Sequence, residues 1–298
     1  MNRSCRSLTS ALCAAVGIVG AAQERPKPPP PPAVPLTAVP VEKPVVLTTE
    51  AGVRVRVVPV ARGLSHPSGL VFLPDSRTML LTERPGRLRI VKDGVLDPNP
   101  ILELPKLNNV SLGGLQDLVL HPDFATNHVL YLSYSKEGDR GVTLAVARAR
   151  LDGTRLADVK DEINVLVAGH NYGWPLVSTG RNYTGTPVSD QPWFRPGMEM
   201  PVFQWNPVIN PANMIFYTGR KFAKWTNSPI VAGAGSKKVV QMTLTRGMVV
   251  SGDSMLHELN VRFRDVRQGP DELLYLLTEG RSRGNNDTDG MLLRLEPE

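Results

Sequence analysis

The chain has 298 residues, of which 41% are hydrophobic and 21% charged, so its composition is that of a globular protein with a sizeable core. The formal net charge of +6 is too modest and too dispersed to indicate nucleic acid as a partner. It is compatible with an anionic small molecule held by a few arginines.

The first 22 residues predict a secretory signal peptide. Arg3 and Arg6 form a basic start, an apolar run extends from Leu8 to Val19, and small residues follow up to Ala22. The run is too short for a stable membrane span. We therefore expect export to a bacterial periplasm, with a buried N-terminal helix or a lipid anchor as the alternatives.

A proline-rich stretch follows the predicted signal peptide. Cleavage near Ala22 would remove Cys5 and Cys13, so the mature protein would have no disulfide and no cysteine metal site. Residues 23–48 contain five consecutive prolines and predict an extended tether that joins no core. The folded part is expected to begin near Thr49.

Beyond the tether, the sequence consists of short β runs broken by Gly, Pro, Asn and Asp. Four segments share the order of an apolar strand, a turn, a second apolar strand, a connection and a third strand. This order is the antiparallel meander of a propeller blade, and a generic sandwich or barrel is the alternative. The segments start at His66, Gly113, Asn210 and Arg262.

The spacing of the four segments contains a gap. The outer intervals between anchor residues, 48 and 51 residues, match a blade period, whereas the middle interval is 97 residues. The anchors are Leu70, Leu118, Ile215 and Val266. The long interval holds residues 152–209, which lack a good blade pattern, and its character changes abruptly at Lys160–Asp161. We predict an all-β partial propeller over residues 49–298, with about four recognisable blades and a seam near 160/161.

Several strings resemble soluble pyrroloquinoline quinone (PQQ)-dependent aldose sugar dehydrogenases of the glucose/sorbosone dehydrogenase family. They include HPSGLVFLPD, GGLQDLVLHPDFATNHVLYLSYS, DEINVLVAGHNYGWP and RFRDVRQGPDELLYLLT, and the resemblance runs from Leu64 to Pro297. It implies a six-bladed β-propeller of the quinoprotein glucose dehydrogenase type, exported to the periplasm, with PQQ and calcium on its top face. The implied reaction oxidises aldose sugars at the anomeric carbon to lactones and passes electrons to an external acceptor.

About two central blades of the family pattern are absent at the seam. In the family they carry the catalytic histidine, a motif that contacts the quinone and a Gly-Pro run that binds the cofactor calcium. Two alternatives to an active dehydrogenase therefore stay open: a non-catalytic propeller that serves as a binding module, and a truncated, inactive gene product.

Arg262 and Arg264 are the predicted cofactor ligands. Alternate residues of a strand point to the same face, and paired guanidiniums suit the carboxylates of PQQ. Arginines in this RxRDV context bind the cofactor in the family. The alternative is a solvated face on which Arg264 pairs with Asp265 or other carboxylates.

The resemblance also assigns residues near the seam. It places Asp161 near the active site, where it is a candidate catalytic residue, and implies that Glu162 and the carbonyl of Tyr172 help to hold a structural calcium. Surface carboxylates are the alternative. Sugar oxidation needs a base for the anomeric proton. None of the five histidines matches the family's base; His66 is expected to have a structural role in a His-Pro turn.

Overall fold

The computed structural model describes most of the chain beyond residue 40, and residues 36–298 cluster as one compact unit. The predicted signal peptide and most of the predicted tether lie outside the described residues. Within the described residues, no helix has the length and hydropathy that a membrane crossing requires. The described ranges are 41–101, 107–108, 113–138, 141–152, 155–162, 186–187, 189–190, 195–196, 205, 209–246, 248–279 and 288–298.

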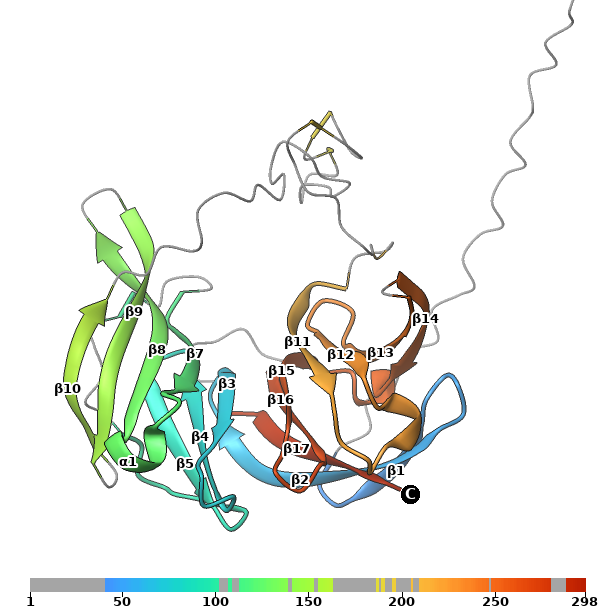
Figure 1. The fold of residues 1–298 in the computed structure, drawn as a ribbon, viewed down its shortest axis with the longest axis horizontal. Helices are drawn as coiled ribbons and strands as arrows, with labels where there is room; N and C mark the ends of the chain where they lie inside the picture. Colours follow the sequence, from blue (N-terminus) through green and yellow to red (C-terminus); the bar gives the residue numbers. More distant parts are fainter. Residues whose placement is uncertain are drawn as a thin grey trace, which may run out of the picture. The chain divides into compact units, whose positions relative to one another are not determined.

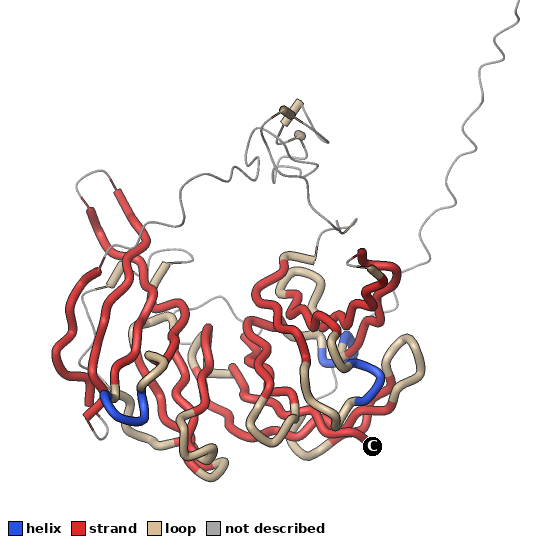
Figure 2. The backbone as a smooth tube through the Cα atoms, in the orientation of Figure 1, coloured by secondary structure: helices blue, strands red, loops and turns tan. Residues whose placement is uncertain are grey.

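The described part of the chain is almost entirely β and forms four antiparallel sheets (Figures 1 and 2). Three of them are meanders of consecutive strands. Sheet I has β3 (Pro67–Phe72), β4 (Thr78–Glu83), β5 (Arg87–Lys92) and β6 (Val95–Leu96). Sheet II has β7 (Leu115–Leu120), β8 (Val129–Gly138), β9 (Gly141–Asp152) and β10 (Arg155–Glu162), with α1 (Phe124–Asn127) between β7 and β8. Sheet III has β11 (Pro211–Tyr217), β12 (Ser228–Gly233), β13 (Lys238–Thr245) and β14 (Met248–Met255), and the short helices η1 (Ala223–Trp225) and η2 (His257–Leu259) accompany it.

Sheet IV joins strands from both ends of the described chain. Its order is β1 (Val45–Thr48), β2 (Arg54–Leu64), β17 (Gly290–Pro297), β16 (Leu274–Glu279) and β15 (Arg262–Gln268). The β2–β17 pairing fastens the N-terminal strand to the C-terminal blade. The four sheets correspond to the four sequence segments, so the prediction of a propeller with four recognisable blades is confirmed.

The sheets pack against one another through the strands β3, β7, β11 and β15. Contacts of β3 with β7 and β15, and of β11 with β15, place sheet I between II and IV, and sheet IV between I and III. One hydrophobic cluster fills each interface: Leu80 and Leu130 between I and II, Leu70 and Leu277 between I and IV, and Trp225 and Phe263 between IV and III. Burial of these apolar faces supplies the main stabilisation of the fold.

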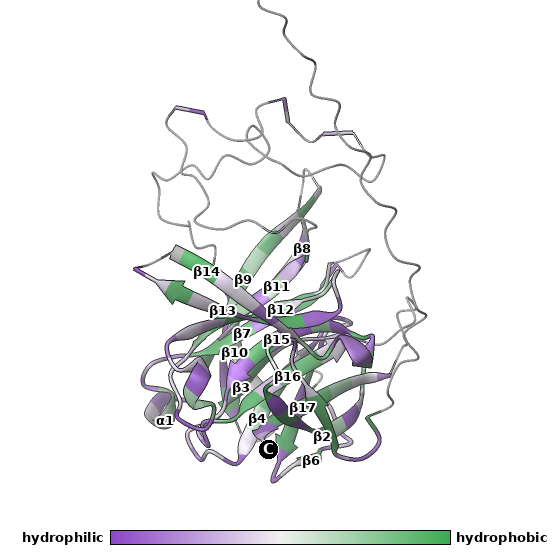
Figure 3. Ribbon diagram, turned by 90° about the vertical axis from the view of Figure 1, so that its right-hand side faces the viewer, coloured by the Kyte–Doolittle hydropathy of each residue, from purple (hydrophilic) through white to green (hydrophobic). Residues whose placement is uncertain are grey.

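Sheets II and III keep apolar side chains exposed that sheets I and IV do not. Figure 3 shows that the strands carry both hydrophobic and hydrophilic residues. Of the large apolar residues that the described ranges leave exposed, sheets I and IV carry only Val95 and Val46, on edge strands. The others are Val119, Val142 and Leu144 in sheet II and Met214, Phe216 and Val250 in sheet III. Each blade normally packs on both faces, so these side chains mark surfaces suited to further blades.

Two features differ in detail from the sequence-based expectation. Residues 45–48 fall within the expected tether but form β1, because their backbone pairs with residues 54–57 of β2. The Lys160–Asp161 step lies inside β10 and pairs with Arg148 and Ala147 of β9. The register is irregular between Ala157 and Lys160, so the strand continues across the step with a local shift.

Candidate functional site

Arg262 and Arg264, at the start of β15, share one carboxylate. Arg262 Nε lies 3.2 Å and Arg264 Nη1 3.9 Å from Oε2 of Glu279. Glu279 ends β16 and stands opposite Arg262 in the sheet register. The shared partner agrees with the same-face prediction. Arg264 meets the carboxylate of Glu279, which is buried, while the side chains of Arg262 and Arg264 are 36% and 17% exposed.

Sheet I contributes two more side chains to the same carboxylate. His66 Nδ1 lies 2.8 Å from Glu279 Oε1, and Arg84 Nη1 lies 3.5 Å from the same oxygen. His66 precedes β3 and Arg84 follows β4, and both are buried. We call these five residues the arginine cluster: three guanidiniums and an imidazole surround a single carboxylate.

The position of Arg84 depends on a close approach by sheet II. Leu115 N donates to the carbonyl oxygen of Arg84 at 3.0 Å. Gly114 has a φ of +119°, and a Cβ added there would lie 2.1 Å from that carbonyl oxygen. Only glycine adopts this backbone without strain. The Gly-Gly pair of the GGLQD string therefore lets β7 begin against Arg84.

A second buried carboxylate organises the neighbouring arginines. Glu83, which ends β4, receives Arg87 Nε at 2.6 Å and Arg89 Nη1 at 3.3 Å, and Ser65 N donates to it at 2.7 Å. Glu83 and Glu279 occupy equivalent places at the ends of two LLTE strings. The repeat thus places one buried acid at the end of the second strand in two sheets.

The charges of the arginine cluster are not balanced. Desolvation opposes ionisation of Glu279, but Arg264, His66, Arg84 and Arg262 together lower the pKa of its carboxyl. Desolvation lowers the pKa of Arg264, Glu279 counteracts this, and the like charges of Arg84 and Arg262 add to the lowering. Positive charge is crowded where water is scarce, a setting that an anionic ligand would relieve.

Two donors of the arginine cluster are buried without a hydrogen-bond partner among the described residues. They are Arg84 Nη1 and Arg262 Nε, whose contacts with Glu279 lack hydrogen-bond geometry. Buried donors in native proteins are nearly always satisfied, so unsatisfied ones point to a missing acceptor. A ligand carboxylate has the charge and the acceptor capacity to fill this role.

A second ionic cluster lies further along β15, and we call it the aspartate cluster. Arg267 Nη2 contacts both carboxylate oxygens of Asp117 at 2.9 and 3.0 Å, and Arg267 Nε contacts Asp265 Oδ2 at 3.0 Å. Asp265 also accepts from Leu70 N at 3.0 Å and from the amide of Asn213. The cluster ties strands of all four sheets together, so Asp117 of the GGLQD string has a structural partner.

The predicted residues at the seam are only partly accessible to the structure. Asp161 and Glu162 lie in β10, where the backbone alone is described, and Tyr172 lies outside the described residues. Within the described ranges, no group of three or more His, Cys, Asp or Glu side chains is arranged to hold a metal ion.

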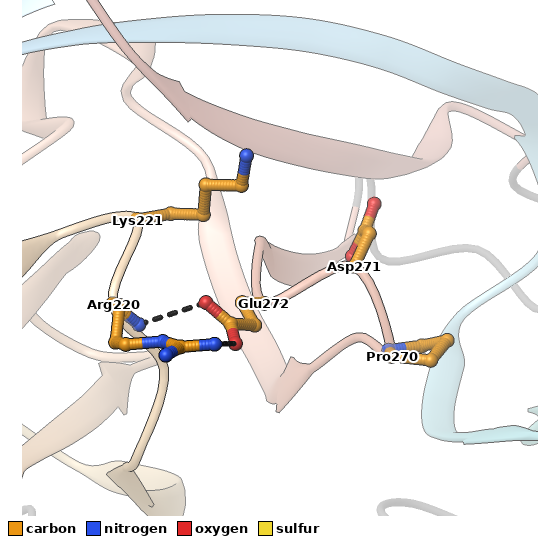
Figure 4. Close-up of a pocket in the computed structure, with 5 residues that line it drawn as sticks. All are labelled: Arg220, Lys221, Pro270, Asp271 and Glu272. Carbon is orange, nitrogen blue, oxygen red and sulfur yellow. Dashed lines mark hydrogen bonds and ion pairs between the residues drawn. The ribbon is translucent and has the colours of Figure 1, made fainter.

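A separate surface pocket lies away from the arginine cluster. It has a volume of about 450 Å³ and is lined by Arg220, Lys221, Pro270, Asp271 and Glu272 (Figure 4). Arg220 N donates to Glu272 at 3.0 Å, and Asp271 accepts from Tyr275 at 2.9 Å. Both acidic side chains are therefore engaged in local structure, and the pocket lacks the convergent donors of the arginine cluster.

Sequence reasoning identified two arginines of the cluster and missed its other members. Arg84 and Glu279 gave a usable signal, because LLTER and LLTEG end equivalent strands of the repeat. His66 was assigned a structural role in its turn. His66 and Glu279 are 213 residues apart in sequence, and only the packing of sheet I against sheet IV reveals their contact.

Comparison with known proteins gives a consistent family. The sequence pattern of the family described as Glucose / Sorbosone dehydrogenase matches residues 64–160 and 157–294. The aldose sugar dehydrogenase YliI of Escherichia coli is 27% identical over an alignment of 343 residues, covering 78% of this chain and 91% of the relative. The uncharacterized protein slr1608 of Synechocystis is 26% identical over 366 residues, covering 81% and 86%.

Solved structures agree with the fold. The apo form of the soluble aldose sugar dehydrogenase of E. coli has a TM-score of 0.72 at 26% identity and covers 82% of this chain and all of that one. A PQQ-bound aldose sugar dehydrogenase of Streptomyces coelicolor has a TM-score of 0.60 at 19% identity, covering 88% and 100%.

The comparisons also bear on the seam. Both relatives align over more residues than the 298 of this chain, so each contains residues without a counterpart here. The two family matches meet at residues 157–160, beside the Lys160–Asp161 step.

Proposed function

Because the chain belongs to the glucose/sorbosone dehydrogenase family, we propose that it binds PQQ at the arginine cluster and oxidises aldose sugars at the anomeric carbon to lactones. The observation that carries this proposal is the imbalance of the cluster. Three guanidiniums converge on one buried carboxylate, and two of their donors lack a hydrogen-bond partner in the part of the chain that the structure describes.

The residues of the cluster fit a cofactor that carries several carboxylates. Arg262, Arg264 and Arg84 would hold it, because guanidinium groups bind carboxylates with paired hydrogen bonds and stay charged at any physiological pH. The relative from S. coelicolor binds PQQ, which supports this choice of anion. When bound, PQQ supplies an acceptor for the hydride of the sugar.

The proton of the anomeric hydroxyl needs a base from the chain. We propose Asp161 for this role, since the resemblance places it near the active site and the family's histidine has no counterpart. The resemblance further supports a structural calcium at Glu162 and the Tyr172 carbonyl, as carboxylate and carbonyl oxygens are the ligands that calcium prefers. Export through the signal peptide to the periplasm, and transfer of electrons to an external acceptor, complete the proposal.

A non-catalytic binding module is the second candidate. The meeting of the two family matches at 157–160, and the extra residues of both relatives, favour it, because they support the loss of blades that carry the family's catalytic groups. In this case the arginine cluster would bind its anion without turnover of sugar.

The two candidates are separated by measuring binding and turnover in the same preparation. PQQ is titrated into the protein with and without calcium, and glucose oxidation is followed by reduction of an artificial electron acceptor. Binding with dye reduction supports the dehydrogenase, and binding without dye reduction supports the module. Chelation of calcium should lower dye reduction if the calcium proposal holds.

Variants connect the result to the cluster. The double variant Arg262→Ala/Arg264→Ala should lose PQQ binding. Arg54→Ala is the matched control, since Arg54 is an exposed arginine that pairs with Glu298 on sheet IV. Equal PQQ affinity in the double variant and the control would contradict the proposed site.

A further inference from the structure

His66 makes the shortest contact in the arginine cluster. Its Nδ1 lies 2.8 Å from Glu279 Oε1, whereas the three guanidiniums stay 3.2 to 3.9 Å from the carboxylate. The side chains of His66 and Glu279 are 3% and 8% exposed, so this contact is shielded from water. Glu279 is therefore held mainly by an imidazole from another sheet, and less by the arginines beside it.

This arrangement matters because Glu279 competes with any anionic ligand. A carboxylate free to turn would form paired hydrogen bonds with Arg262 or Arg264, the geometry that guanidinium and carboxylate prefer. Those bonds would occupy the donors that an incoming carboxylate needs. With Oε1 held by His66, Glu279 reduces the repulsion among the arginines but does not serve as a hydrogen-bond partner for Arg262 Nε, which has none among the described side chains and backbone.

We propose that His66 is a positioning residue of the anion site: it anchors Glu279 and keeps the arginines available to the ligand. This inference rests on the proposed function of the cluster. It assigns His66 no contact with the ligand, since its action passes through Glu279.

The charge state of Glu279 suits it to this anchoring contact. The lowered pKa of Glu279 keeps its carboxylate ionised near neutrality, so it can accept a charge-assisted hydrogen bond from a donor at the His66 position. The other charged groups nearby in sheet I are Glu83, Arg87 and Arg89, and Asp265 of β15 contacts Arg267 in the aspartate cluster.

The backbone at His66 supplies a matched pair of variants. Its φ is +46°, a left-handed conformation that Asn and Gly adopt with little strain. His66→Asn places an amide donor near the Nδ1 position. His66→Gly removes the donor altogether. Thermal unfolding of each variant shows whether the fold is retained.

The experiment measures the dissociation constants of PQQ and of a second carboxylate probe, benzene-1,3,5-tricarboxylate, at one pH by tryptophan fluorescence. His66→Asn should bind PQQ within about threefold of wild type, because its amide restores a donor to Glu279. His66→Gly should bind PQQ about tenfold more weakly, as expected for a lost charge-assisted hydrogen bond. In a Glu279→Gln background, His66→Gly should add less than about a twofold change.

The outcomes separate the two proposals. An affinity in His66→Asn as low as that of His66→Gly, or an unchanged affinity in His66→Gly, overturns the role of His66 and leaves the anion site intact. A tenfold effect of His66→Gly that persists without the Glu279 carboxylate also overturns it. Failure of both PQQ and benzene-1,3,5-tricarboxylate to bind the wild-type chain overturns the anion site and this inference together.

Discussion

The arginine cluster and the aspartate cluster lie on the same strand, β15, and have opposite charge balance. The first surrounds one carboxylate, Glu279, with three guanidiniums, two of whose donors no described residue satisfies. The second surrounds one guanidinium, Arg267, with two carboxylates. Burial by itself raises the pKa of both acids. At Glu279 the neighbouring arginines and His66 outweigh burial and lower the pKa, whereas at Asp265 burial and the nearby Asp117 raise the pKa to about 7.

This difference in charge balance distinguishes the arginine cluster, a candidate binding site, from the aspartate cluster, which links neighbouring sheets. Asp265 is fully buried, and its oxygens accept from Leu70 N, Val266 N, Asn213 and Arg267. It joins neighbouring sheets and has no free capacity for a ligand. The arginine cluster has donors in excess of acceptors, so it is the cluster that can bind an anion.

The largest expected effect is on stability, at the aspartate cluster. Asp265→Ala would leave Arg267 Nε, the Asn213 amide and two backbone N–H groups without their acceptor, and should cost about 3–5 kcal/mol of unfolding free energy. Urea denaturation measures this cost. The control is Arg77→Ala, which breaks the exposed pair with Asp93 and should cost less than about 1 kcal/mol. Equal costs would remove the structural distinction between the clusters.

The pH dependence of stability should have opposite signs at the two clusters. The raised pKa of Asp265 means that the fold favours its neutral form, so wild type should lose stability relative to Asp265→Asn as the pH rises from about 4 to 7, by about 3 kcal/mol. The lowered pKa of Glu279 gives the reverse: wild type should lose its advantage over Glu279→Gln as the pH falls below about 4.5. Urea denaturation at several pH values tests both, and slopes of the same sign would refute the comparison.

A smaller effect is expected on ligand binding. Arg264→Ala should weaken PQQ binding by about 10- to 100-fold, the loss expected for hydrogen bonds between charged groups. Its effect on unfolding free energy should be slight, since it also relieves repulsion from Arg84 and Arg262. Fluorescence titration and thermal unfolding provide the two values. A variant that binds PQQ normally but unfolds readily would show that Arg264 stabilises the fold and does not bind the ligand.

The smallest expected effect on PQQ binding tests how sheet II supports the arginine cluster. Gly114→Ala should cost about 1–3 kcal/mol of stability, because its φ is positive and the new Cβ would meet the carbonyl of Arg84. Displacement of Arg84 should also weaken PQQ binding several-fold. The control is Gly94→Ala, which has a positive φ but no atom within 4 Å of the added Cβ. Equal PQQ affinity in the two variants would exclude Arg84 from the site.

Local sequence patterns determined the blades. The apolar strand–turn–strand order of the four segments predicts the meanders of sheets I to III and the C-terminal strands of sheet IV, because alternation and turn residues act over a few positions. The same-face relation of Arg262 and Arg264 followed from strand geometry alone. The abrupt change at Lys160–Asp161 was visible in the same way, as a break in the repeat.

Only the tertiary structure decided which residues, distant in sequence, contact the same charged group. His66 and Glu279 come from two different sheets and form a hydrogen bond. Residues 45–48 form β1 because their backbone pairs with the edge of β2. The register that brings three guanidiniums to Glu279, and the opposite balance around Asp265, depend on how four sheets pack around β15. Spacing in sequence fixes which face of a strand a side chain occupies, whereas packing between strands fixes what that side chain meets.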